Sequence, residues 1–248
     1  MNNKSENINS ILNQIFNPHL FGDNNSFKES YKLPSFFEIK TFAKLLADKS
    51  TEEAIQKFLD NHPHFLFRSV PTSGDSCLGL LIKPQIGLSY KADYAILSAG
   101  QGGCGITLIE IEKSSHSLFT KKLTPSKHFQ SALGQIDDWN QWINSNSLFF
   151  SKSMLDLLKK SQYKPDKLNG KSFRYLSPNK IENAWNSFGG NEVVHVHSHI
   201  VIGRWGLLSA QERKRLIYIN NSKRANFKSI QTYDQMIRMA IEGPQMIW

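Results

Sequence analysis

The chain has 248 residues, of which 40% are hydrophobic, enough to bury the core of one α/β domain with an extension or of two small domains. Its 30 Lys and Arg residues outnumber 21 Asp and Glu residues, so the net charge is +9, which favours a polyanionic partner. No apolar run approaches the roughly 18 to 20 residues of a membrane span, and no strongly basic amphipathic helix is evident. We therefore expect nucleic acid as the partner and no membrane.

The beginning of the chain, residues 1–34, is rich in Asn and Ser and carries one short apolar periodic stretch over residues 8–15. It predicts a short helix followed by a linker. A basic segment followed by an apolar one is missing there, so we expect no secretory signal and place the protein in the cytoplasm. Cys77 and Cys104 have no CxxC spacing, and we expect both to be reduced.

Apolar periodicity predicts the elements that follow, in chain order. Helices are expected over residues 36–47 and 51–61, the second opening on a Ser-Thr-Glu-Glu cap and ending at His62-Pro63. Alternating segments bounded by Gly, Ser or Pro predict a hairpin-rich sheet. Its strands are 78–82, 90–97 and 106–112; then come helices 127–144 and 154–161, an irregular insertion 164–191, strand 193–202, helix 209–219, strand 227–230 and helix 232–241.

The glycine-rich stretch 100–105 is not a phosphate-binding loop. Such a loop leads from a strand into a helix whose N-terminus receives the phosphates, whereas this stretch leads into the strand at 106–112. We interpret it as a flexible hairpin loop and expect no nucleotide cofactor.

Acidic residues end two neighbouring strands of the predicted sheet. Strand alternation places Glu110 and Glu112 on one face, and Asp93 precedes Glu110 across the hairpin loop, which can bring them together. Burying carboxylates side by side is costly unless a cation neutralises them, and an oxygen-only cluster suits Mg²⁺ or Mn²⁺. Such an ion supports phosphodiester hydrolysis. The alternative is that the acids merely sit at the solvent-exposed ends of their strands.

The acids resemble the core of the PD-(D/E)xK nucleases. That pattern is an Asp, about fifteen to twenty residues, an acid, one residue and a third polar group, found here as Ala92-Asp93-Tyr94-Ala95 and Ile109-Glu110-Ile111-Glu112-Lys113. A following helix with Gln135 is similar to the Gln-bearing helix of many of these enzymes. The segments Phe58 to Pro63, Ile200 to Arg204, Glu212 to Leu216 and Ile230 to Ile237 resemble the Shedu family of antiphage defence proteins, a branch of that superfamily, over roughly residues 50 to 240.

The resemblance implies a restriction-endonuclease-like α/β core, a mixed β-sheet flanked by helices, with a helical N-terminal extension. It divides the chain into a variable segment at 1–50 and a nuclease domain at 51–248. It also implies a metal-dependent DNA endonuclease of prokaryotic antiphage defence that assembles as a homo-oligomer, with Asp93, Glu110 and Glu112 holding the metal and Gln135 reaching the site.

One position departs from the family pattern, because Glu112 stands where the pattern has Lys and Lys113 follows it. Lys113 faces the other way unless a bulge rotates the strand. Some restriction endonucleases resemble this variant and remain active, since a third carboxylate can bind metal or act as a base on water. The alternative is a module that binds DNA without cutting it. A purely structural assembly protein is a third reading, in which the acids would lie apart.

Two further groups bear on binding. His195, His197 and His199 share one face of a strand but stand about 6 to 7 Å apart, too far to converge easily on one ion. The alternative is that they line a DNA-facing surface. Arg204 ends the same strand and is expected to reach the site or a phosphate. Basic residues that favour phosphate contact are Lys121, Lys122, Lys127, Arg213, Lys214, Arg215, Lys223, Arg224 and Lys228.

Overall fold

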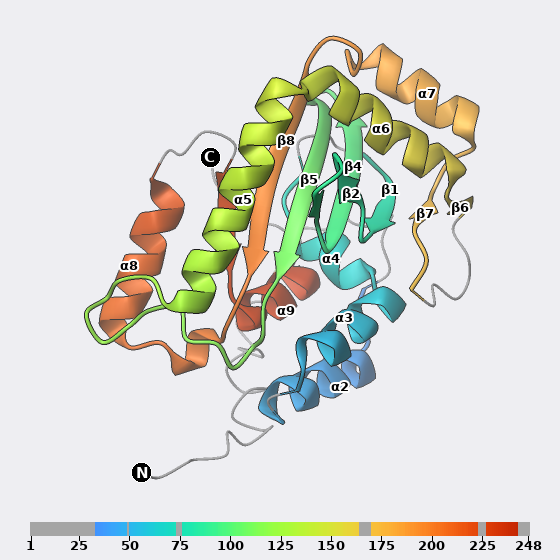
Figure 1. Cartoon of the computed structure of the whole chain (residues 1–248). Helices are drawn as coiled ribbons and strands as arrows, with labels where there is room; N and C mark the ends of the chain where they lie inside the picture. The colour runs from blue at the N-terminus through green and yellow to red at the C-terminus, as the bar shows by residue number, and fades with distance from the viewer. Residues whose placement is uncertain (1–32, 49, 73–75, 164–169, 223–226, 243–248) are drawn as a thin grey trace.

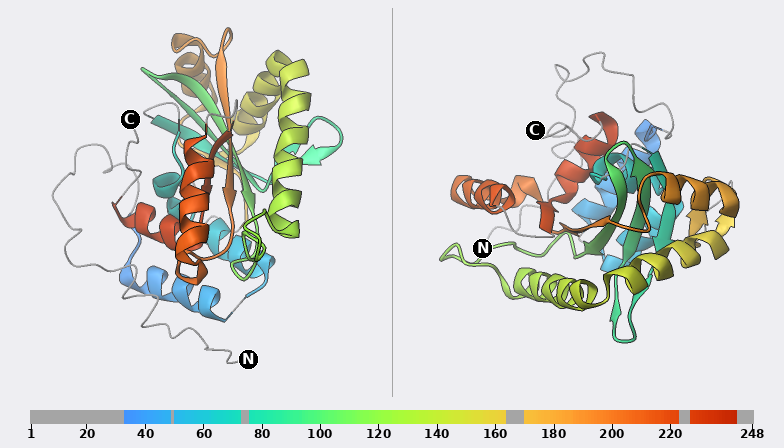
Figure 2. Two further views of the ribbon diagram at one scale, coloured as in Figure 1. Left: turned by 90° about the vertical axis from the view of Figure 1, so that its left-hand side faces the viewer. Right: turned by 90° about the horizontal axis from the view of Figure 1, so that it is seen from above.

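The computed structural model describes residues 33–48, 50–72, 76–163, 170–222 and 227–242. Its centre is a seven-stranded mixed sheet with the strand order β6-β7-β1-β4-β5-β8-β9 and helices on both faces (Figures 1 and 2). The predicted α/β class, a mixed sheet flanked by helices, is confirmed. The strands are β1 (Ser76–Ile82), β2 (Gln85–Ile86), β3 (Tyr90–Lys91), β4 (Tyr94–Gly100), β5 (Gly103–Ile111), β6 (Gln162–Tyr163), β7 (Phe173–Arg174), β8 (Val194–Val201) and β9 (Phe227–Gln231).

The helices cover the two faces of this sheet separately. They are α2 (Phe36–Ala47), α3 (Glu52–Asn61), α4 (His64–Ser69), α5 (Lys127–Ser145), α6 (Ser147–Lys160), α7 (Pro178–Ser187), the short 3₁₀ helix η2 (Trp205–Leu207), α8 (Ala210–Asn221) and α9 (Tyr233–Glu242). Side chains of β5 alternate between two cores, as strand geometry requires. Ile106 and Leu108 join the core that contains α5 and α6, whereas Ile109 and Ile111 join the core that contains α2, α3, α4 and α9.

The sheet is antiparallel on one side of β5 and parallel on the other. β4 pairs antiparallel with both β1 and β5, while β8 pairs parallel with β5 and with β9. The hairpin between β4 and β5 is tight, with Gly100 opposite Gly103. The glycine-rich stretch is therefore a hairpin turn, as predicted, although most of its glycines lie within the strands.

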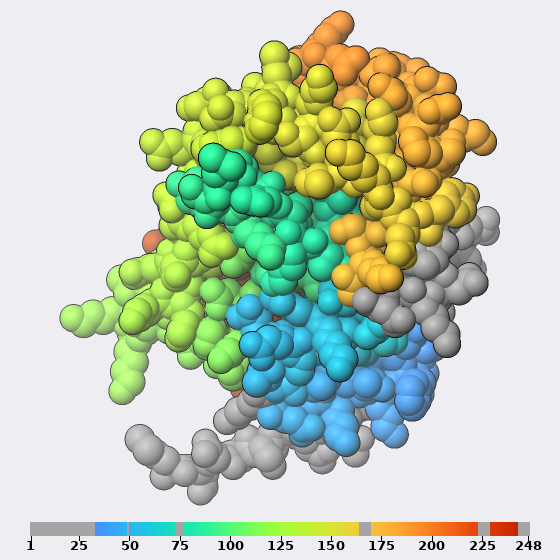
Figure 3. Space-filling model, turned by 45° about the vertical axis from the view of Figure 1, so that its right-hand side comes forward, coloured from blue at the N-terminus to red at the C-terminus, as the bar shows by residue number. Residues whose placement is uncertain are grey.

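The short β2–β3 hairpin interrupts the chain between β1 and β4. It lies on the surface beside α5 and α6 and next to α3 (Figure 3). Two backbone hydrogen bonds close its base, from Lys83 N to the Asp93 carbonyl at 2.8 Å and from Ala92 N to the Pro84 carbonyl at 3.1 Å. This closure holds Lys83 and Asp93 opposite one another.

Polar caps explain where several helices begin. The Ser35 side chain accepts a hydrogen bond from Glu38 N in a capping box at the start of α2, and Thr51 accepts one from Ala54 N at the start of α3. Both helices begin within one residue of the predicted positions. The segment predicted to be helical at residues 8–15 lies outside the described residues, and the domain boundary at residue 50 stays a prediction.

Several predicted elements were wrong in extent. The segment 164–191 is not irregular, because its described part contains β7 and α7. Helix α7 was missed because only two of its side chains, Ile181 and Trp185, are buried, and they span about one helical turn. The strand predicted at 90–97 breaks at residues 92–93, and that predicted at 106–112 ends at Ile111. Helix α6 begins seven residues before the predicted start at 154, and α4 was not predicted.

Helices from opposite ends of the described chain pack together beneath the sheet. Helix α4 lies against α9, and the Arg68 guanidinium donates hydrogen bonds to the carbonyls of Ala240 and Ile241 at the end of α9. A cation at a helix C-terminus satisfies carbonyls that have no partner within the helix. None of the helices in the described ranges is long and apolar enough to cross a membrane.

Arg204 follows β8 and forms a buried ion pair with Asp234 in α9. Its Nη2 lies 2.7 Å from Asp234 Oδ1, its Nε lies 2.9 and 3.0 Å from the two carboxylate oxygens, and its side chain is 1% exposed. The prediction that Arg204 reaches a phosphate is therefore wrong, because its guanidinium group is bound to the Asp234 carboxylate inside the protein. The pair joins β8 to α9.

Replacing this arginine should destabilise the protein. Arg204→Gln leaves the Asp234 carboxylate buried without its cation, which costs about 3 to 5 kcal/mol in the free energy of unfolding, measured by urea denaturation. The control Arg215→Gln, at an exposed position of α8, should change that free energy by less than about 0.5 kcal/mol. Equal stability of the two variants would contradict a structural role for Arg204.

Candidate active site

Acidic side chains gather where β4 begins and β5 ends. Tyr94 pairs with Ile109 at the start of β4. Asp93 precedes this pair, and its backbone N–H donates to the Ile109 carbonyl at 3.2 Å, which places Asp93 beside Glu110. The hairpin thus brings the two acids together, as the sequence predicted.

The Asp93 carboxylate is held on both oxygens. Its Oδ1 accepts a hydrogen bond from Gln56 Nε2 at 2.9 Å and pairs with the Lys83 ammonium, while its Oδ2 accepts one from the Ile111 backbone N–H at 2.7 Å. The residue is only 7% exposed. Three donors therefore keep this buried side chain in one orientation, pointing along the end of β5.

Glu110 has the opposite character, because its carboxylate makes no hydrogen bond or ion pair within the described part of the chain. It is 9% exposed. Burial, followed by the negative charges of Asp93, Glu112 and Glu52, raises the pKa of Glu110 to about 9. Without a cation, this side chain is a protonated acid at neutral pH.

Helix α3 supplies a fourth acid that the sequence analysis missed. Burial raises the pKa of Glu52, and the charges of Asp93 and Glu112 raise it further. Gln56 Nε2 donates to Glu52 Oε1 at 3.1 Å as well as to Asp93, so one amide joins the helix to the sheet. Glu52 and Gln56 are four residues apart on one helical face, a signal that was available but was assigned to the helix cap alone.

Lys83 is the second site residue that the sequence did not reveal. Its side chain is 39% exposed, yet its ammonium pairs with Asp93 and its charge lowers the pKa of Glu52 and Glu110. It directly follows β1, ten residues before Asp93 in the sequence, and the pairing of β1 with β4 brings it to the acids. A lysine is thus present among the acids, although not at position 112.

Glu112 and Lys113 follow the last residue of β5. The register of β5 with β8 runs without a bulge to Ile111, and Glu112 N then donates to the Val201 carbonyl at 2.8 Å. Burial raises the pKa of Glu112, against the opposing charges of His128 and Lys113. Because the strand has ended, alternation no longer decides where Lys113 points, and its charge also lowers the pKa of Glu52.

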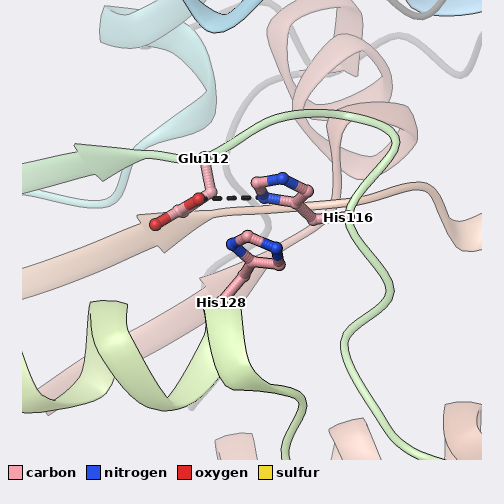
Figure 4. Close-up of side chains that lie close together, drawn as sticks. All are labelled: Glu112, His116 and His128. Carbon is pink, nitrogen blue, oxygen red and sulfur yellow. Dashed lines mark hydrogen bonds and ion pairs between the residues drawn. The ribbon is translucent and has the colours of Figure 1, made fainter.

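Glu112 also contacts a histidine on the loop beyond the strand. Its Oε2 lies 3.0 Å from His116 Nδ1, and the His116 ring stacks on that of His128 (Figure 4). Burial and the charge of Lys113 lower the pKa of His116. The sequence analysis singled out neither histidine.

Gln135 lies on α5, half-buried. It is seven residues, about 10 Å along the helix axis, beyond His128, and no hydrogen bond within the described ranges joins it to any of the acids. Its role in the site stays a prediction.

The three histidines of β8 have separate surroundings. His199 is buried and hydrogen-bonded to Gln231 at 3.0 Å and to Ser229 at 2.8 Å, so it does not line a DNA-facing surface. His195 is exposed and stacks with His197 at a centroid distance of 6.4 Å. The predicted spacing, too wide for one ion, agrees with this distance.

The basic residues fall into two groups. Lys121, Lys122 and Lys127 are exposed around the loop that leads from β5 to α5, at the acid end of the sheet (Figure 1). On α8, Lys214 and Arg215 are exposed, whereas the Arg213 guanidinium packs over Trp205 at 5.3 Å. Lys223, Arg224 and the side chain of Lys228 lie outside the described part of the chain.

A family model described as Shedu protein SduA, C-terminal, matches residues 49–237, more than half of the chain. The chain belongs to the Shedu family. This membership suggests antiphage defence and a nuclease-like module, and the matched range contains Glu52, Asp93, Glu110 and Glu112. No match is found among curated proteins.

The raised pKa of Glu110 predicts a pH-dependent stability in the presence of a chelator. Glu110 binds its proton more tightly in the folded chain than in the unfolded one, so its contribution is full below about pH 4.5 and is lost as pH rises through about 9. The free energy of unfolding should fall over this interval by at most about 1.4 kcal/mol per pH unit from this group, and the melting temperature should fall with it. Glu110→Gln should flatten the fall, as measured by thermal denaturation in EDTA.

The matched control is Glu192→Gln, at an exposed position. It should keep the wild-type pH dependence. A Glu110→Gln profile parallel to that of the wild type would show that Glu110 is ionised in the folded protein, against the environment described above.

Proposed function

We propose that this chain is a divalent-metal-dependent DNA endonuclease acting in antiphage defence. The observation that carries the proposal is the buried Glu110 carboxylate, which lies beside Asp93 and has no partner among the described residues. In a chain of the Shedu family, this arrangement supports a site that takes up a cation and acts on phosphodiesters.

The donor set fits Mg²⁺ or Mn²⁺, because it consists of carboxylate oxygens. Glu110 is available as a ligand, and Asp93 becomes available when Lys83, whose side chain is 39% exposed, releases Oδ1. Glu112 or Glu52 would complete the set. Such an ion supplies a lowered pKa for bound water and stabilises the charge on phosphate oxygens.

The protein groups around this position have distinct tasks. Burial and neighbouring charges move the pKa of Glu52 and of Glu112 upward, toward neutral pH. A general base accepts a proton from water most effectively when its pKa lies near the pH of the reaction. Lys83 places a positive charge beside Asp93, and it can serve as the cation that the family pattern otherwise has at position 112. Gln56 keeps Asp93 and Glu52 in fixed positions.

DNA would approach the acid end of the sheet over the basic loop. Lys121, Lys122 and Lys127 are exposed there, and positive side chains bind phosphates without reading sequence. Assembly as a homo-oligomer remains part of the proposal, as does the absence of a nucleotide cofactor.

A second candidate is a module that binds DNA without cutting. It is favoured by one observation: Glu112 stands at the expected Lys position and directs one carboxylate oxygen at His116. Cleavage in the presence of Mn²⁺ separates the two candidates, because the binding module would retain DNA under every metal and cut none of it.

Removing either metal-binding acid should abolish cutting. Asp93→Ala and Glu110→Ala are expected to lower the rate of Mn²⁺-dependent nicking of supercoiled DNA by at least about 10²-fold, because each loses a ligand that stabilises the transition state. The rate is measured from the conversion of supercoiled to open-circular plasmid.

Asp138→Ala and Glu192→Ala, at exposed positions, are the controls and should cut at the wild-type rate. Asp93→Asn retains the shape of the side chain, so a loss of cutting there with an unchanged melting temperature excludes misfolding as the cause. Equal rates in the wild type and in both site variants would place the chemistry elsewhere.

Neutralising Lys121, Lys122 and Lys127 should lower the affinity for DNA and also make that affinity less dependent on salt concentration. In Lys121→Gln/Lys122→Gln/Lys127→Gln, the slope of log affinity against log salt concentration should shrink by up to about 2.7, since each phosphate contact contributes about 0.9. Fluorescence anisotropy with a labelled duplex at several salt concentrations measures this slope.

The control replaces three exposed lysines of α6 and α7, in Lys152→Gln/Lys160→Gln/Lys180→Gln. It removes the same net charge away from the acid end of the sheet. If both triple variants lose the same slope, binding follows net charge alone and the loop is not the DNA-binding surface.

A further inference from the structure

A mixed group of donors lies beside the acid cluster and shares one residue with it. Glu112, His116 and His128 each offer one ligand atom, a carboxylate oxygen or an imidazole nitrogen, and these atoms all lie within 4.8 Å of one another (Figure 4). The side chains of His116 and Glu112 are 17% and 15% exposed, while His128 is exposed.

The backbone holds these residues in place independently of any ligand. After β5 the chain turns, with His116 N donating to the Lys113 carbonyl at 3.2 Å, and it returns to the strand end when Ser126 N donates to the Leu118 carbonyl at 2.8 Å. Ser126 then caps α5, whose second residue is His128.

Gly203 fixes the same loop from the other side. Its N–H donates to the Lys113 carbonyl at 3.3 Å, its φ is +63°, and a Cβ there would lie 2.7 Å from the His116 carbonyl oxygen. The loop that carries His116 therefore approaches the backbone of Gly203 so closely that no other residue would fit at position 203. Its position is set by packing, so the two histidines are preorganised beside Glu112.

We propose that Glu112, His116 and His128 bind a transition-metal ion of the zinc class. One carboxylate and two imidazoles form a donor set of intermediate softness, which suits Zn²⁺, Co²⁺ or Ni²⁺, whereas the neighbouring oxygen-only acids suit Mg²⁺ and Mn²⁺. Three protein ligands leave one tetrahedral position for water.

The geometry requires only side-chain rotation. Bonds of about 2.0 to 2.2 Å to a tetrahedral ion place ligand atoms roughly 3.3 to 3.5 Å apart, and Glu112 Oε2 and His116 Nδ1 are already 3.0 Å apart. The two rings stack at 3.6 Å with an interplanar angle of 11°, so their in-plane lone pairs run parallel. One ring must tilt, and the exposed His128 has room to do so.

The ion would also fix the orientation of Glu112. One of its oxygens faces His116, and the other points away from both rings in Figure 4. A metal ion bound by the two histidines would therefore keep the Glu112 carboxylate oriented toward them. In that orientation Glu112 is less able to act as a general base in DNA cleavage. The metal site itself stands on its own geometry; only this effect on cutting rests on the proposed function.

Cobalt binding to the full chain tests the site directly. Co²⁺ titrated into the purified, chelator-treated protein should give the visible absorption of a tetrahedral ion at about one equivalent, and Zn²⁺ but not Mg²⁺ should remove it. His116→Gln and His128→Gln should each weaken Co²⁺ binding by at least about tenfold, the lower end of the cost of losing even an outer-shell partner.

Two controls give the result its meaning. His195→Gln, at an exposed histidine of β8, and Asp93→Asn, in the acid cluster, should bind Co²⁺ as the wild type does. Wild-type affinity in His128→Gln, a loss of binding in Asp93→Asn, or no tetrahedral absorption in the wild type would each overturn the proposal. A protein that binds Co²⁺ through His128 but never cuts DNA would contradict the proposed function and leave this inference intact.

Discussion

Repulsion between carboxylates in a partly dry environment governs the acid end of the sheet. Four of them gather there, and the charges of Asp93, Glu112 and Glu52 all raise the pKa of the fourth, Glu110. Nearby cations and hydrogen bonds offset part of this repulsion. Lys83 and Gln56 contact the Asp93 carboxylate, and the charge of Lys113 lowers the pKa of Glu52 and Glu112. Glu110 makes no hydrogen bond or ion pair in the described part of the chain, and the charge of Lys83 offsets only part of the rise in its pKa. That imbalance costs stability, and it is the ground on which we propose a cation site.

How far the site was predictable depended on how local its geometry is. Asp93 and Glu110 were found because the register of a hairpin depends on residues close in sequence: two alternating strands joined by a short glycine turn bring the acids side by side. Glu52 and Lys83 were missed because they reach the acids only through the packing of α3 and the pairing of β1 with β4. Tertiary contacts of this kind leave no periodic signal in the sequence.

The same reasoning explains the predictions that were wrong. Arg204 looked like a phosphate ligand because its partner, Asp234, belongs to another element and no spacing rule links the two. The region around α7 looked irregular because only two of its side chains are buried. The overall α/β class was nonetheless predictable, since β5 and α5 carry long apolar patterns that packing reinforces.

The contact between α4 and α9 has a consequence for biosynthesis. The core beneath Asp93 and Glu52 is shared by helices from both ends of the described chain, and Arg68 caps a helix whose carbonyls lie 172 and 173 residues later. On the ribosome, the core that α3 shares with α4 therefore stays incomplete until α9 has emerged. The arrangement of the acids should mature last, after nearly all of the domain has been translated, which delays any activity toward nucleic acid near the site of synthesis.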